Sequence, residues 1–122
     1  MDNFSDSYGK RHGNENYMAW EPWLDDGHTA TAEVGSYDPN PFGLHDVHGN
    51  LMEWCRDWFI PYGSEVRAGD GERVGGHANR VLRGGCFQSL VNLGRSASRE
   101  DVNPGDAAPS LGVRPARAVS GR

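Results

Sequence analysis

The chain has 122 residues, a formal net charge of −5 at pH 7 and a mean hydropathy of −0.71. The length predicts one domain with a small core. The acidic balance disfavours nucleic acid or an anionic membrane as a partner, because both need a basic surface. No apolar stretch is long enough to insert into a bilayer, and the first residues lack a signal-peptide pattern, so the sequence leaves the compartment open.

The first 43 residues are predicted to be mostly irregular. Residues 1–28 are polar and aromatic without a helical period, which indicates an ordered loop. Residues 28–37 alternate weakly between small apolar and polar side chains, as in a strand or an extended segment. Residues 38–43, DPNPFG, are turn-forming. Seventeen glycines and seven prolines favour turns throughout, while four each of Trp, Tyr and Phe argue against disorder.

The stretch GLHDVHGNLMEWCRDW gathers acids, histidines, a thiol and tryptophans around a Gly-Asn turn. Leu51, Trp54 and Trp58 recur at intervals of three and four residues. This spacing fits one helical turn or a short strand, with the tryptophans buried in either case. The stretch is a candidate metal site, catalytic site or rigid structural corner.

The remainder is predicted to hold two short strands within long loops. Residues 61–79 read as a polar, glycine-rich loop, and residues 80–84, RVLRG, as a short strand. Residues 85–110 are irregular. Residues 111–119, LGVRPARAV, read as a final strand, which Pro115 confines to an edge or a strand end.

The metal-binding side chains are too sparse for a zinc cluster. Cys55 and Cys86 either form one disulfide or remain free and buried, and we favour free thiols. His45 and His48 have no third ligand at a useful spacing, so they are expected to make ordinary polar contacts. The arginines of the C-terminal third are spaced singly, and we expect them to pair with acids and brace loops.

Four motifs in order resemble the formylglycine-generating-enzyme (sulfatase-modifying factor) family. They are GLHDVHGNLMEWCRDW, RVLRGG at 80–85, RSASR at 95–99 and LGVRPAR at 111–117. The resemblance runs from Asn3 to about Val119. It implies an α+β, C-type-lectin-like fold of the formylglycine-generating-enzyme type, loop-rich with short strands and little helix. We expect residues 1–122 to form a single such domain lacking the N-terminal part of the family domain, which a further segment or a homo-oligomer would supply.

The resemblance also implies structural calcium, held by side-chain oxygens and backbone carbonyls. Calcium accepts six to eight hard oxygen ligands of this mixed kind. The alternative is that the acids cap backbone amides or pair with arginines. The two implied ligand sets are Asn3, Asp26 and the carbonyls of Phe4 and His28, and Asp46, Glu53 and the carbonyls of Gly49 and Leu51.

The family's oxidase uses two cysteines after the RGG motif to bind copper and convert a substrate cysteine to formylglycine. The matching positions in this chain are Ser89 and Gly94. A serine hydroxyl cannot replace a soft thiolate toward copper(I). We therefore expect no copper and no catalytic residue. The alternative is a genuine oxidase that uses Cys86, or an inactive paralogue of it.

Residues 86–110 lie between well-matched motifs and are predicted to bind a ligand, because rigid scaffolds carry binding residues on such loops. The RGG and LGVRPAR frame also resembles the variable proteins of diversity-generating retroelements, several of which occur in phage or on bacterial surfaces and bind protein ligands. The partner expected is a protein or cell-surface ligand. The apolar members are either exposed anchors or core. The candidate binding residues are Cys86, Phe87, Gln88, Ser89, Leu90, Val91, Asn92, Leu93, Glu100, Asp101, Val102, Ala107, Ala108 and Ser110.

Overall fold

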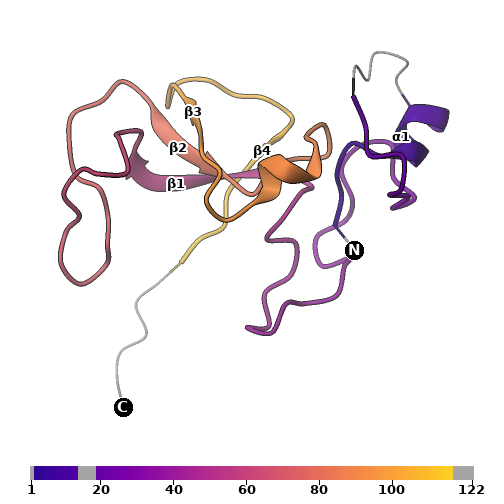
Figure 1. The fold of residues 1–122 in the computed structure, drawn as a ribbon, viewed down its shortest axis with the longest axis horizontal. Coiled ribbons are helices and arrows are strands. Elements are labelled where there is room, and N and C mark those ends of the chain that lie inside the picture. Colours follow the sequence, from indigo (N-terminus) through magenta and orange to yellow (C-terminus); the bar gives the residue numbers. More distant parts are fainter. Residues whose placement is uncertain (1, 14–18, 117–122) are drawn as a thin grey trace.

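The computed structural model describes residues 2–13 and 19–116. Within them a small four-stranded sheet lies apart from a short helix, with long loops between (Figure 1). No helix of the described residues is long and apolar enough to cross a membrane. The elements in chain order are α1 (Ser7–His12), β1 (Met52–Trp58), β2 (Arg80–Arg83), the 3-10 helix η1 (Val91–Gly94), β3 (Glu100–Val102) and β4 (Leu111–Gly112).

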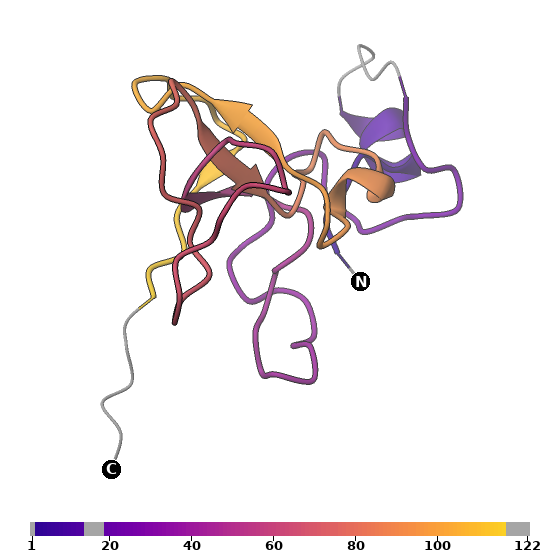
Figure 2. The ribbon, with the colours of Figure 1, turned by 60° about the vertical axis from the view of Figure 1, so that its left-hand side comes forward.

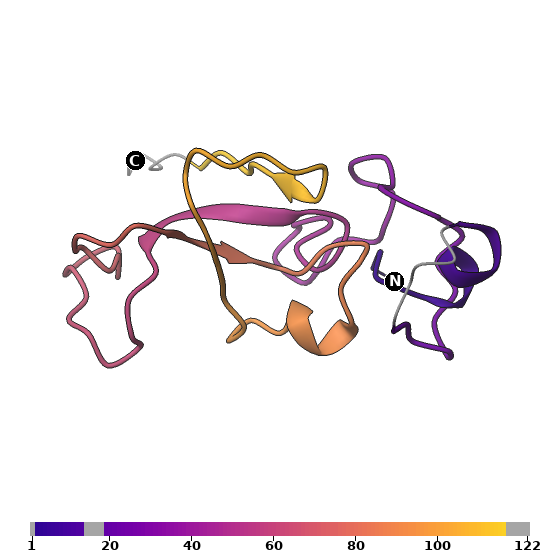
Figure 3. The same cartoon turned by 90° about the horizontal axis from the view of Figure 1, so that it is seen from above.

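The sheet has the order β3-β2-β1-β4. β2 pairs antiparallel with both β1 and β3, and β4 runs parallel to β1, so that Met52 faces Leu111 (Figure 3). β1 settles the choice left open for this stretch in favour of a strand, which contains Trp54 and Trp58 and begins directly after Leu51. Their spacing of three and four residues suits a strand here because its register shifts between Trp54 and Trp58.

Two expectations for the N-terminal part were incomplete. Residues 1–28, predicted as a loop, contain the helix α1, which Asp6 caps by accepting a hydrogen bond from the Gly9 amide at 2.8 Å. The helix gives no apolar period because Gly9 is its one buried residue. Residues 28–37 form no strand and are held as an irregular segment.

The last predicted strand is shorter than expected. It pairs only through Leu111 and Gly112 within the described residues, and Pro115 follows where a continuing ladder would need an amide donor. Residues 117–119 of that prediction lie outside the described residues. The strand predicted at 80–84 is confirmed as β2.

The Gly49-Asn50 turn joins three distant segments. The Gly49 amide donates to the Gly84 carbonyl at 2.7 Å, and the Asn50 amide donates to the Asn3 carbonyl at 2.6 Å. The Asn50 side chain accepts from the Ala32 amide at 2.9 Å and donates back to the Ala32 carbonyl at 3.2 Å. Asn50 is 5% exposed, so these bonds lie inside the protein. The turn therefore works as a structural corner.

The core is small and lies around this corner. Val81 and Leu82 of β2 are almost completely buried, and Phe4 and Cys86 pack close by with Gly94 and Ser89. η1 lies between the sheet and the α1 region, as two views show (Figures 1 and 2). The chain thus has a sheet with a dense polar and apolar junction at one end.

We predict that Gly49→Ala destabilises the domain by roughly 3 kcal/mol or more. Gly49 has φ +70, and a Cβ there would lie 2.8 Å from the Asn3 carbonyl carbon and closer still to its oxygen. Both sides of this contact are backbone, so neither can move away to make room for the methyl group. Gly35→Ala is the matched control, because Gly35 has φ +80 with nothing within 4 Å, so it should cost about 1–2 kcal/mol. Equal losses in thermal and chemical unfolding would contradict the role assigned to the corner.

Candidate functional site

The residues that follow β2 form a tight, buried turn. The Ser89 amide donates to the Cys86 carbonyl at 2.8 Å, and the Cys86 amide donates to Ser89 Oγ at 3.1 Å. The Ser5 amide donates to the Ser89 carbonyl at 3.0 Å. Cys86 is 3% exposed and Ser89 7%. Two of the candidate binding residues therefore form the packed base of the segment and do not face solvent.

Gly94 packs against the ring of Phe4. A Cβ on Gly94 would lie 2.9 Å from Phe4 Cε1 and closer still to Cζ, with the Gly84 carbonyl oxygen 3.2 Å away. Phe4 is itself 4% exposed, so it cannot swing into solvent without opening the core. The position that the resemblance gives to the oxidase's second cysteine thus has no room for any side chain.

The rest of the segment presents side chains at its surface to different degrees. Leu93 is 40% exposed, whereas Leu90 and Val91 are half-buried. Leu93 is therefore the better candidate anchor, and Leu90 and Val91 contribute to packing. Those that are exposed are Gln88, Asn92, Leu93, Asp101, Ala107 and Ala108, and those half-buried are Phe87, Leu90, Val91, Glu100, Val102 and Ser110.

The first predicted calcium set comes together in space. Asp26 accepts hydrogen bonds from the Phe4 amide at 3.2 Å and the His28 amide at 2.8 Å. Asn3 donates through Nδ2 to the Ala30 carbonyl at 2.8 Å. The Asp26 side chain is fully buried, and this desolvation raises the pKa of its carboxyl group above the ordinary value. His28 Nδ1 lies 3.9 Å from Asp26 Oδ1, so this carboxyl group is held by two backbone amides and one imidazole.

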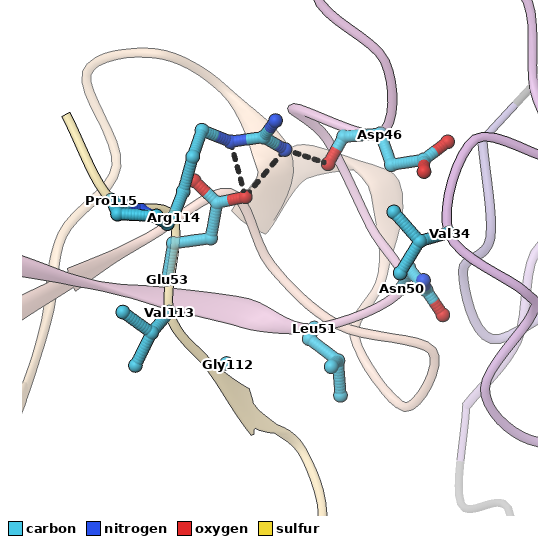
Figure 4. Close-up of a pocket in the computed structure, with 9 residues that line it drawn as sticks. All are labelled: Val34, Asp46, Asn50, Leu51, Glu53, Gly112, Val113, Arg114 and Pro115. Atoms are coloured by element: carbon cyan, nitrogen blue, oxygen red, sulfur yellow. Dashed lines mark hydrogen bonds and ion pairs between the residues drawn. The ribbon is translucent and has the colours of Figure 1, made fainter.

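The two carboxylates of the second predicted calcium set make different contacts (Figure 4). Glu53 Oε1 lies 2.6 Å from Arg114 Nη2 and 2.7 Å from Arg114 Nε. Arg114 also donates to the carbonyls of His45, at 2.9 Å, and of Asp46. The carboxylate of Asp46 points away from this pair; one oxygen accepts from the Gly35 amide, and Oδ1 is buried without a partner. Asp46 Oδ1 thus has no hydrogen-bond partner among the described residues, whereas the Glu53 carboxylate forms an ion pair with Arg114.

Both thiols are free. Cys86 is buried and Cys55 is half-buried. Burial raises the pKa of the Cys55 thiol, an effect that the neighbouring Arg83 opposes. A thiol in this state is a poor nucleophile and a poor metal ligand at neutral pH. Among the described residues, no group of three or more His, Cys, Asp and Glu side chains could hold a metal ion.

Three arginines of the C-terminal third brace loops through backbone carbonyls. Arg83 donates to Ser96, Arg95 to Asn92 and Arg99 to Ile60, at 2.6, 2.9 and 2.8 Å. Their expected pairing with acids is not seen among the described residues, where Arg114 supplies the one such ion pair of this region. Arg99 instead stacks on the Tyr62 ring at 3.7 Å from its centroid.

Residues 1–119 match the family of sulfatase-modifying factor enzyme 1-like domains. The chain belongs to this family. Its relatives include the formylglycine-generating enzyme of Streptomyces coelicolor, 45% identical over 94 residues that cover 74% of this chain and 30% of that protein. They also include the serine/threonine-protein kinase pkn1 of Chlamydia pneumoniae, 43% identical over 93 residues that cover 74% of this chain and 15% of that protein. The chain thus spans under a third of the length of these two relatives.

Solved structures share the fold. PvdO from Pseudomonas aeruginosa aligns with a TM-score of 0.65 and 31% identity over 72% of this chain and 34% of its own. Treponema denticola variable protein 1 aligns with a TM-score of 0.58 and 31% identity, over 70% of this chain and 31% of its own. These neighbours, with the loop-rich sheet described above, confirm the α+β, C-type-lectin-like fold of the formylglycine-generating-enzyme type.

We predict that Gly94→Ala destabilises the domain by roughly 2 kcal/mol, because the added methyl group overpacks the Phe4 ring. Gly76→Ala is the control, since nothing lies within 4 Å of that position, and it should be nearly neutral. In a Phe4→Leu background the Gly94→Ala penalty should fall by about 1 kcal/mol or more. Thermodynamic cycles from chemical unfolding measure this coupling, and independent, additive losses would refute the packing argument.

Proposed function

We propose that this domain is a non-catalytic binding module that presents residues 86–110 to a protein ligand. The observation that carries the proposal is the state of the two positions equivalent to the oxidase's cysteines. Ser89 is a buried hydroxyl bonded to the Cys86 amide, and Gly94 is closed off by Phe4. Neither position carries a copper-binding thiolate, and Gly94 has no space for one.

The frame around the segment supports a binding role. Residues 84–110 leave the sheet after β2, return to it at β3 and end at β4, so the segment is fastened to the sheet at both ends and once between. Side chains on such a frame are held in place before a ligand arrives, which lowers the entropic cost of binding. The likeness to a Treponema denticola variable protein points in the same direction.

The competing proposal is an oxidase that acts on a substrate cysteine. Its support is the 45% identity to a formylglycine-generating enzyme. Cys86 lies beside one of the equivalent positions, with Sγ 3.4 Å from Ser89 Oγ. A single thiol that is 3% exposed has neither the second sulfur donor nor the access that this chemistry requires.

Binding is tested with peptides selected from a random display library on the wild-type domain. We expect Leu93→Ala to weaken the selected peptides about tenfold or more, because it truncates an exposed anchor, with no change in melting temperature. Val66→Ala is the matched control: Val66 is 45% exposed on the 61–79 loop and should have no effect. Equal losses in both variants, measured by calorimetry, would refute a binding face on η1.

The oxidase is tested on the same protein preparation by copper(I) titration and by oxygen-dependent aldehyde formation on a cysteine-containing peptide. We expect neither a stoichiometric copper site nor aldehyde. A stoichiometric site that disappears in Cys86→Ser would overturn the binding proposal in favour of the enzyme.

We further propose that calcium supports the junction around the Gly49-Asn50 corner. The support is the buried carboxylate of Asp26 and the unpartnered buried Oδ1 of Asp46. Both are hard oxygen ligands of the kind calcium prefers, and carbonyls of the neighbouring loops would complete the coordination. Glu53 is the weakest member of the predicted sets, because a cation at its carboxylate would have to displace Arg114 or lie beside it.

Added calcium should raise the melting temperature, and a chelator should lower it, because a ligand that binds the folded state stabilises it. Asp26→Asn and Asp46→Asn should each reduce this increment. Glu53→Gln should lower the melting temperature by breaking the ion pair with Arg114, yet keep the calcium increment. A melting curve that chelation leaves unchanged would remove calcium, and loss of the increment in Glu53→Gln would restore Glu53 as a ligand.

A further inference from the structure

A hollow of about 420 Å³ opens beside β1 and β2, at the start of the loop that follows η1. Its volume falls in the range of sites that hold small molecules or single side chains. The hollow borders Gly94, so it lies next to one of the two positions equivalent to the oxidase's cysteines. The residues that give it its character are Glu53, Trp54, Cys55, Arg83, Arg95 and Arg114.

The hollow is cationic although the chain carries a net charge of −5. Three arginines face one glutamate, and Arg114 already neutralises Glu53 through contacts of 2.6 and 2.7 Å. This leaves the charges of Arg83 and Arg95 in excess. His48 also lines the hollow.

Neither Arg83 nor Arg95 forms an ion pair with a carboxylate within the described residues. Arg83 Nη1 donates to the carbonyls of Ser96 and Ser98, and Nη2 is 3.4 Å from the Tyr62 hydroxyl. Arg95 uses Nε for the Asn92 carbonyl at 2.9 Å. Its terminal nitrogens make no hydrogen bond that the described residues supply. Two guanidinium groups are thus held by neutral acceptors, and planar N–H forks of this kind match an oxyanion.

We propose that this hollow receives an oxyanion, a carboxylate, sulfate or phosphate group, from the ligand that residues 86–110 bind. Arg95 lies in that segment, so the inference rests on the proposed function and deepens it. Arg83 and Arg95 contact the oxyanion. The indole of Trp54 and the side chain of Val47 supply the apolar contact for the carbon skeleton that carries it.

Cys55 provides a chemical probe of ligand binding in this hollow. Cys55 lines the hollow and is half-buried, whereas Cys86 is 3% exposed, so an alkylating reagent should modify Cys55 first. An oxyanion bound in the hollow would shield the Cys55 thiol from the reagent, because Cys55 is among the residues that line it. Occupancy should therefore slow alkylation of Cys55 without touching Cys86.

The test compares the binding of sulfate, phosphate and succinate, added as sodium salts, with that of sodium chloride at equal ionic strength. It uses the whole 122-residue chain. Binding is followed by tryptophan fluorescence and by the rate of Cys55 alkylation by iodoacetamide, assigned by peptide mass. At least one of the three oxyanions should slow the alkylation of Cys55 more than chloride does. The one that does so at the lowest concentration identifies the class, carboxylate or tetrahedral oxyanion.

Arg95→Gln should weaken that oxyanion about tenfold, because it removes a charged donor pair from the site. Arg83→Gln should do so as well, but Arg83 also braces two carbonyls, so Arg95→Gln decides. Arg11→Gln is the matched control: Arg11 lies on α1 and pairs with Asp25, so this substitution should leave binding unchanged. Failure of all three oxyanions to exceed chloride, or equal binding by the wild type and Arg95→Gln, would overturn the inference.

This result is separable from the test of the proposed function. Leu93 does not line the hollow, so Leu93→Ala should keep oxyanion binding while it loses the selected peptides. If oxyanions bind but Leu93→Ala weakens no selected peptide, the hollow is supported and the binding face on residues 86–110 is refuted. If Leu93→Ala weakens the selected peptides but no oxyanion binds, the binding face is supported and the hollow is refuted.

Discussion

The side chain of Asn50 is the interaction on which the rest of this structure depends. A single buried amide bonds both the amide and the carbonyl of Ala32, while its backbone bonds Asn3 on one side and Phe87 on the other at 3.0 Å. Asn50 itself has φ +60 and follows Gly49 at φ +70. Asparagine tolerates this left-handed backbone better than other non-glycine residues. A chain with little apolar core thus obtains its tertiary order from polar bonds converging on one turn.

This arrangement explains how loops make up most of the described chain and still adopt one shape. Buried backbone groups outside helices and strands must find partners, and here they find one another at the corner. The sheet adds the apolar part, with Val81 and Leu82 of β2 almost completely buried. The same junction includes Phe4, which belongs to the N-terminal segment. Its ring lies against Gly94, one of the two positions that the resemblance assigns to the oxidase's cysteines.

The sequence carried the family, the loop-rich character and β2, because those depend on local patterns such as RVLRGG. It left β1 undecided, since spacing of three and four residues fits a helix unless a register shift is known. It missed α1, whose single buried residue is a glycine. It also missed the hollow, because Arg83, Arg95 and Arg114 are spaced singly and meet only once the sheet has formed. The burial of Ser89 and the ring against Gly94 link residues about 85–90 positions apart, which no local pattern reveals.

The parallel pairing of β4 with β1 has a consequence for synthesis of the chain. Met52 meets Leu111 only after the whole intervening stretch has left the ribosome, and parallel partners of this kind close slowly because the connecting chain must first be ordered. Until then one edge of β1 remains open to any other extended polypeptide nearby. The nascent chain is therefore most prone to mispairing before Leu111 and Gly112 emerge, and the pairing of these two residues closes the open edge of β1.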